Sequence, residues 1–180
     1  MATHGMLPNI REHSFLVMEV ACFLGQALVQ AGFDLHLQLI EAGALLHDLG
    51  KTPCLGTGRN HAQWGAEILH GLGYPEAAQV VAEHVYLVEN NGDPRPFREA
   101  EVVNYADKRV LHDRVVTLED RFADLMERYG LTVEARSRIA VAWAKVQALE
   151  ERLFAPLGLS PGALLQVNGR FKVQGSPVQS

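Results

Sequence analysis

Apolar side chains recur along most of the chain at intervals of three or four residues, which places them on one face of a helix. This pattern predicts a short helix after Ser160 and seven longer helices over residues 10–31, 34–49, 60–71, 74–89, 98–112, 118–129 and 133–154. No segment alternates apolar and polar residues as a half-buried strand does. We therefore expect an all-α fold, built as one compact bundle of helices.

Residues that favour helix ends mark several of these boundaries. Asp34, Thr117 and Thr132 precede apolar-periodic segments, and their side-chain oxygens can accept the unpaired N–H groups of a first turn. Gly50 follows the second apolar run where a helix would end, and glycine adopts positive φ there at little cost. Residues 51–60 and 91–96 contain proline and glycine, so we expect loops there.

The length of 180 residues suits a single domain with its own core. We assign residues 1–166 to that domain, with its motifs at about 10–128 and its C-terminal helices at 132–166, and residues 167–180 to a loosely ordered tail. The net charge of −5 leaves no broad basic surface for duplex nucleic acid. Because the N-terminus lacks a signal-peptide core and no uncharged apolar run reaches membrane-spanning length, we expect a cytoplasmic protein without a membrane partner.

Six ionisable residues lie on apolar faces or at the ends of apolar runs: His13, His47, Asp48, His61, His84 and Asp107. A single histidine of this kind is more often a hydrogen-bonded core residue, and the adjacent His47 and Asp48 could simply form a polar helix terminus. Buried carboxylates need partners, however, and Asp107 has no lysine or arginine at i±3 or i±4. A shared divalent metal would satisfy all six side chains, and six ligands with a bridging aspartate can hold two ions.

The order of these residues resembles the HD superfamily of metal-dependent phosphohydrolases. The matching strings are REHS at 11–14, HDLGK at 47–51, NHA at 60–62, GAEIL at 65–69 and ADKR at 106–109. The strings ADKRV and LEDRF between 106 and 122 also resemble HD domains fused to molybdenum-cofactor nucleotidyltransferase-like domains, although no transferase domain is present here.

The resemblance implies that a primary metal is held by His13, His47, Asp48 and Asp107. Asp48 would then bridge to a second metal held by His61 and His84. Iron or manganese fits these ligands best, and zinc, nickel, cobalt or magnesium are possible. The implied reaction is hydrolysis of a phosphoester or phosphoanhydride in a nucleotide or another small phosphorylated metabolite.

Asp48 and Lys51 are the candidate catalytic residues, with Asp48 orienting the attacking water. Lys51 could also neutralise a substrate phosphate, and Arg59 is a second phosphate-binding candidate. Lys51 could equally be a solvated lysine near a helix end. Of Lys108 and Arg109, one could face the pocket and the other solvent.

Two other functions are compatible with the sequence. Some HD proteins with a similar ligand set hold a di-iron centre and act as oxygenases. An HD fold can also serve as a catalytically silent nucleotide-sensing domain. The remaining histidines (His4, His36, His70 and His112) are expected at or near the surface.

Overall fold

The computed structural model describes residues 5–88 and 96–167. Residues 91–95 of the expected loop and 168–180 of the expected tail lie outside these ranges. Within the described ranges the helices, in order, are α1 (Pro8–Gln30), α2 (Leu37–Leu46), α3 (Lys51–Cys54), α4 (His61–Gly71), α5 (Pro75–Glu83), α6 (Glu99–Lys108), α7 (Leu118–Tyr129) and α8 (Val133–Phe154). A short antiparallel pair, β1 (Val110–Leu111) and β2 (Arg114–Val115), follows α6, and a 3₁₀ helix, η2 (Pro161–Gln166), follows α8. The all-α prediction is confirmed.

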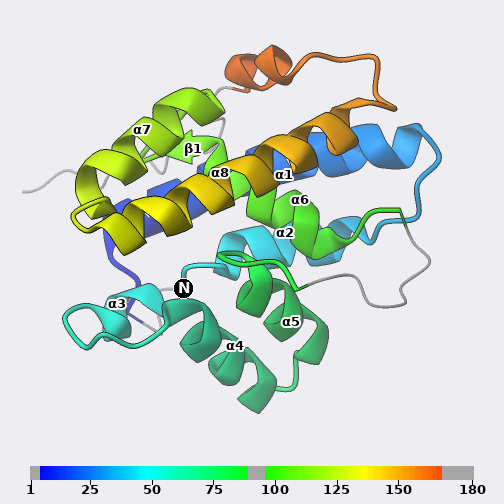
Figure 1. Cartoon of the computed structure of the whole chain (residues 1–180). Coiled ribbons are helices and arrows are strands. Elements are labelled where there is room, and N and C mark those ends of the chain that lie inside the picture. Colours follow the sequence, from blue (N-terminus) through cyan, green and yellow to red (C-terminus); the bar gives the residue numbers. More distant parts are fainter. Residues whose placement is uncertain (1–4, 89–95, 168–180) are drawn as a thin grey trace, which may run out of the picture.

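Helix α6 lies at the centre of the bundle. All ten of its residues are buried, and it packs against α1, α2, α5 and α8. Figure 1 shows α8 crossing α6, while α4 and α5 lie together on the other side of the bundle. Because α6 carries Asp107 near its C-terminal end, the centre of the bundle also positions a candidate ligand.

The pattern of buried residues on α1 explains its place in the core. Ile10, Val17, Val20, Leu24 and Leu28 are buried at helical spacing. By length and composition alone α1 could cross a membrane, but more than half of its most apolar window is buried inside this fold. We therefore treat α1 as a core helix.

Two predicted caps are present, and one is replaced. The hydroxyl oxygens of Thr117 and Thr132 accept the backbone N–H groups of Asp120 and Ala135 at 3.2 and 3.1 Å. The second helix begins at Leu37, so Asp34 does not cap it; the His36 ring accepts the Leu39 N–H at 3.1 Å instead. Glu99 holds the His36 backbone N–H at 2.9 Å, and this long-range contact sets the helix start.

Three helix ends also differ from the sequence pattern. The second helix stops at Leu46, and part of the expected 51–60 loop forms α3. The helix expected over 74–89 is α5, which stops at Glu83. The helix expected over 98–112 is α6, which stops at Lys108, where the chain turns back through the small β1–β2 hairpin. Two-residue strands are too short to produce a recognisable alternation, so sequence periodicity cannot reveal them.

Gly50 is required for a different reason from the one expected. Its φ is −80°, so it does not serve as a left-handed helix cap. A methyl group at this position would collide with the carbonyl oxygen of His61 and lie 2.7 Å from the amide nitrogen of Gly65. The missing side chain allows the turn after α2 to pack directly on the backbone of α4.

Candidate metal centre

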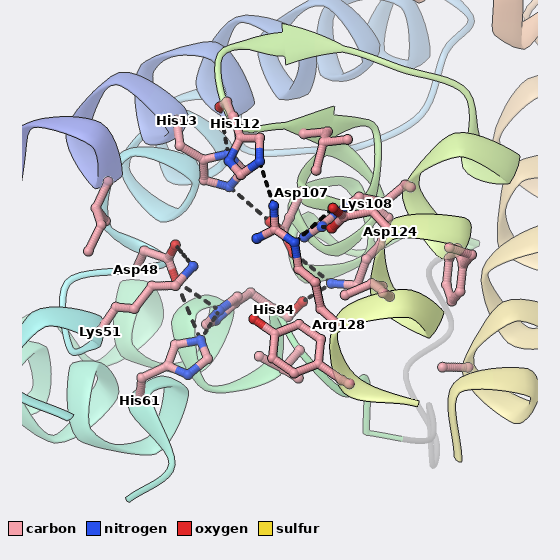
Figure 2. A pocket seen from close by; sticks show the side chains of 18 of the residues that line it. His13, Asp48, Lys51, His61, His84, Asp107, Lys108, His112, Asp124 and Arg128 are labelled. Carbon is pink, nitrogen blue, oxygen red and sulfur yellow. Dashed lines mark hydrogen bonds and ion pairs between the residues drawn. The ribbon is translucent and has the colours of Figure 1, made fainter. Parts of the chain in front are cut away.

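Five of the six predicted ligands line one pocket, although they come from distant parts of the chain (Figure 2). The sixth, His47, is fully buried beside Asp48. Most of them are placed by helix ends. His47 and Asp48 lie in the turn after α2, and His84 directly follows α5. His61 opens α4, where the Asn60 side chain accepts the Ala62 N–H at 3.0 Å. The other two, His13 and Asp107, lie within α1 and near the C-terminal end of α6.

Asp48 lies between the histidines of the two expected metal positions. Its Oδ2 is 3.4 Å from Nε2 of His47. Its Oδ1 is 3.4 Å from Nε2 of His61 and 3.7 Å from Nε2 of His84. Its two oxygens therefore face different imidazoles, an arrangement that suits a carboxylate shared by two ions.

Asp107 faces the other side of the cluster. Its Oδ1 is 3.1 Å from Nε2 of His13 and 3.7 Å from Nε2 of His47. Two groups of three residues, His13–His47–Asp107 and His47–Asp48–His84, each bring one ligand atom per residue within 4.8 Å of one another. These distances allow a cation to sit among each group.

Backbone carbonyls orient three of the four imidazoles. The Nδ1 atoms of His47 and His84 lie 2.7 and 2.6 Å from the carbonyl oxygens of Ala44 and Val81, and Nδ1 of His13 lies 3.1 Å from that of His112. Since a carbonyl accepts only, Nδ1 donates in each case, and a neutral ring then presents the lone pair of Nε2 to the cluster. Metal-binding histidines are held in this way by their outer neighbours.

The candidate ligand atoms are better matched to a metal ion than to one another as hydrogen-bond partners. Nε2 of His47 is buried and makes no hydrogen bond among the described residues. Nε2 of His61 lies 3.1 Å from Nε2 of His84, so two atoms that both present lone pairs in the metal-binding tautomer face each other. A cation would satisfy these atoms together with the carboxylates, so the residues present fit divalent metal.

Electrostatics keep the carboxylates ionised. Burial opposes ionisation of Asp48, but His47 and Lys51 hold its pKa well below the usual range. Burial also opposes ionisation of Asp107, and Lys108 and His13 lower its pKa in turn. Ionised carboxylates are the form that binds metal.

Among the cluster's histidines, pKa values shift in different directions. Burial lowers the pKa of His84 to about 3, and burial also lowers the pKa of His61. Burial lowers the pKa of His47 as well, but Asp48 and Asp107 more than offset this, and the net shift is upward. His61 and His84 are therefore neutral at pH 7, as ligands must be.

The two candidate phosphate-binding residues lie in different places. Lys51 lines the pocket, and its Nζ is 2.7 Å from Oδ2 of Asp48, while its side chain stays 43% exposed. Arg59 does not line this pocket; its guanidinium lies 5.2 Å from the ring centre of Trp64.

Lys108 and Arg109 point to opposite sides of the end of α6. Lys108 lines the pocket, with Nζ 2.6 Å from Oδ2 of Asp107. Arg109 does not face solvent as suggested but is buried, with its guanidinium 3.1 Å from Glu150. An arginine can be buried here because Glu150 and neighbouring oxygens receive its N–H groups.

His112 has a role that sequence reasoning missed. It adopts φ of +58° in the β1–β2 turn, an uncommon conformation for a residue other than glycine. This places its carbonyl oxygen against His13, and its ring nitrogen Nε2 2.7 Å from Arg128. No residue type signals the first contact, because every residue carries a backbone carbonyl.

Comparison with known proteins agrees with this arrangement. The sequence profile of the HD domain family matches residues 10–130, and the chain belongs to that family. An uncharacterized protein of Methanocaldococcus jannaschii is 29% identical over 143 residues, which cover 73% of this chain and 83% of the relative. No solved structure gives a significant match. The family belongs to the metal-dependent phosphohydrolase superfamily, and the histidine and aspartate cluster fits its metal-binding character.

Proposed function

We propose that this protein is a hydrolase of a small phosphorylated metabolite, such as a nucleotide, and that it uses two divalent metal ions. The observation that carries the proposal is the position of Asp48, with one oxygen facing His47 and the other facing His61 and His84. When bound, divalent ions supply a water of near-neutral pKa and withdraw charge from phosphoryl oxygens.

The chain's own side chains would orient the reacting groups. Asp48 can also accept a hydrogen bond from the attacking water and so hold it in place. Lys51 and Lys108 are each paired with a carboxylate of the cluster, at 2.7 and 2.6 Å. Both line the pocket and could donate hydrogen bonds to phosphoryl oxygens beside the cluster. We propose a small phosphorylated substrate acted on in the cytoplasm, with no nucleic-acid duplex or membrane as partner.

The test begins with elemental analysis of freshly purified protein. The metal found is restored to saturation, and the protein is assayed against phosphomonoesters, nucleotides and phosphoanhydrides. We expect hydrolysis of at least one class, abolished by chelation and recovered with metal. Binding of nucleotides without turnover of any panel member would favour a sensing domain. Oxygen-dependent turnover with the spectrum of a coupled di-iron pair would favour an oxygenase.

The number of ions is tested separately. His61 and His84 flank only one side of Asp48, so we expect the double variant His61→Ala, His84→Ala to keep about one ion where the parent protein holds two. His70→Ala serves as the control, because this exposed histidine does not line the pocket. Equal metal content in the parent and the His61/His84 variant at saturation would refute the two-ion proposal.

A further inference from the structure

The pocket wall facing the ligands is formed by α7 and α8 and is basic. The charged residues that this wall contributes are Arg121, Asp124, Arg128 and Arg138. Three arginines against one aspartate leave an excess of two positive charges on this wall, while Glu12 and Asp113 line other parts of the pocket. This wall is distinct from the cluster, whose own cations, Lys51 and Lys108, are each paired with a carboxylate.

Asp124 contacts two of these arginines, and one of them, Arg128, has a second partner. Oδ1 of Asp124 forms an ion pair with Nε of Arg128 at 2.8 Å, and Oδ2 accepts a hydrogen bond from Nη1 of Arg121 at 3.4 Å. His112 receives Nη2 of Arg128 at 2.7 Å, and Figure 2 shows this side chain reaching from α7 toward His112. Arg128 is nevertheless 45% exposed, so its guanidinium is oriented yet accessible to a ligand.

The α7–α8 wall lines the same pocket as the cluster residues Asp48, His61, His84 and Asp107. Apolar side chains such as Phe122, Leu125 and Ile139 lie on the same α7–α8 wall. The pocket encloses about 800 Å³, which suits a whole organic metabolite rather than one phosphate group.

We propose that Arg121, Arg128 and Arg138 form a second anion subsite, and that the substrate carries a further phosphate or carboxylate besides the phosphoryl group at the cluster. This inference rests on the proposed hydrolase function for the identity of the first group. Arginine suits the role because its planar guanidinium binds phosphate or carboxylate through two parallel N–H donors. Asp124 and His112 are positioning residues that aim Arg128 into the pocket.

The experiment is calorimetric binding to the Mn²⁺-loaded protein at fixed ionic strength. Matched ligands differ by one anionic group: adenosine 5′-monophosphate against adenosine 3′,5′-bisphosphate, and sorbitol 6-phosphate against 6-phosphogluconate. We expect at least one doubly anionic ligand to bind about tenfold more tightly than its partner, the gain typical of a charge-assisted contact. The first pair reports a phosphate preference and the second a carboxylate preference.

The variants Arg128→Gln and Arg138→Gln should each reduce this advantage to less than about threefold, because each removes a charged donor. Arg114→Gln should retain it, since Arg114 is exposed but does not line the pocket. The proposal is overturned if the parent shows no advantage in either pair, or if the advantage persists in both subsite variants. Because the readout is relative affinity and does not require turnover, absence of hydrolysis would count against the proposed function alone.

Discussion

At the scale of single residues, Asp48 is the carboxylate whose two oxygens face different histidines of the cluster. It is buried, and its oxygens face His47 on one side and His61 and His84 on the other. Burial of an ionised carboxylate costs several kcal/mol unless cationic partners compensate for it. The burial of the Asp48 carboxylate among three histidines is therefore consistent with a cation bound beside it.

We expect Asp48→Asn to lose bound metal, because a neutral amide is a poor ligand for divalent ions. We also expect kcat to fall by more than about 100-fold, since replacing even a residue that only orients a metal ligand lowers metal affinity or activity by about 10–100-fold. Metal content and hydrolysis of the best panel substrate are measured together. Asp34→Asn, an exposed residue outside the pocket, is the matched control. Full metal content in Asp48→Asn would contradict the assignment.

The ligand residues could be recognised in the sequence because a histidine or aspartate on an apolar stripe is conspicuous. His13 lies among Ile10, Val17 and Val20, and the structure buries all four. Which of the six ligand residues lie next to each other could not be predicted, since this depends on how five chain segments approach one another. Arg128 was missed, although Arg121, Asp124 and Arg128 recur at helical spacing, because a charged stripe usually faces only solvent.

At the scale of secondary-structure elements, the cluster depends on the end of α5 docking against α6. The Asn104 side chain donates to the carbonyl oxygens of His84 at 2.9 Å and Glu83 at 3.4 Å. Asn104 is itself buried in α6. It thus holds the backbone that carries a candidate ligand, without touching the cluster.

Replacing Asn104 by leucine keeps the side chain's size but removes these hydrogen bonds. We expect metal affinity to fall about 10–100-fold, the usual effect of losing a group that orients a ligand. Metal titration of the purified variant provides the measurement. Gln38→Leu, which changes an exposed amide on α2, should bind metal normally. Unchanged affinity in Asn104→Leu would show that α5 is held in place by other contacts.

The existence of most helices could be predicted, but several of their ends could not. Thr117 and Thr132 were identified because a capping side chain acts within one turn. The start of α2 depends instead on Glu99, 63 positions away from His36. Gly50 was recognised as important, but the close backbone approach that requires it is visible only in three dimensions.

Gly50→Ala tests this close approach. The added methyl group meets the backbone of α4, which cannot move as a side chain can, so we expect a loss of about 1–3 kcal/mol in unfolding free energy. Denaturant unfolding measures it. Gly71→Ala is the control, since a methyl group there meets nothing within 4 Å. A variant as stable as the parent would mean that the turn and α4 can separate at little cost.

At the scale of the whole molecule, Arg109 joins the ligand-bearing helices to the C-terminal segment. It is buried, with its guanidinium 3.1 Å from Glu150 of α8 and 3.2 Å from the carbonyl oxygen of Pro161 at the start of η2. The Tyr105 hydroxyl also bonds to Glu150. Neither Arg109 nor Glu150 lines the pocket, so this network can be changed without touching the candidate site.

Glu150→Ala leaves the buried guanidinium of Arg109 without its carboxylate. Breaking a fully buried pair costs about 3–5 kcal/mol, and because the Glu150 side chain is 23% exposed we expect a smaller loss of about 2–3 kcal/mol in unfolding free energy. Removing the charge as well, in Arg109→Met, Glu150→Ala, should recover part of that loss, because no uncompensated ion then remains. Metal content should be unchanged in both variants. Glu151→Ala, which changes an exposed neighbour on the same helix, is the matched control. Equal stability of the Glu150→Ala and Glu151→Ala variants would show that the Arg109–Glu150 pair does not stabilise the fold.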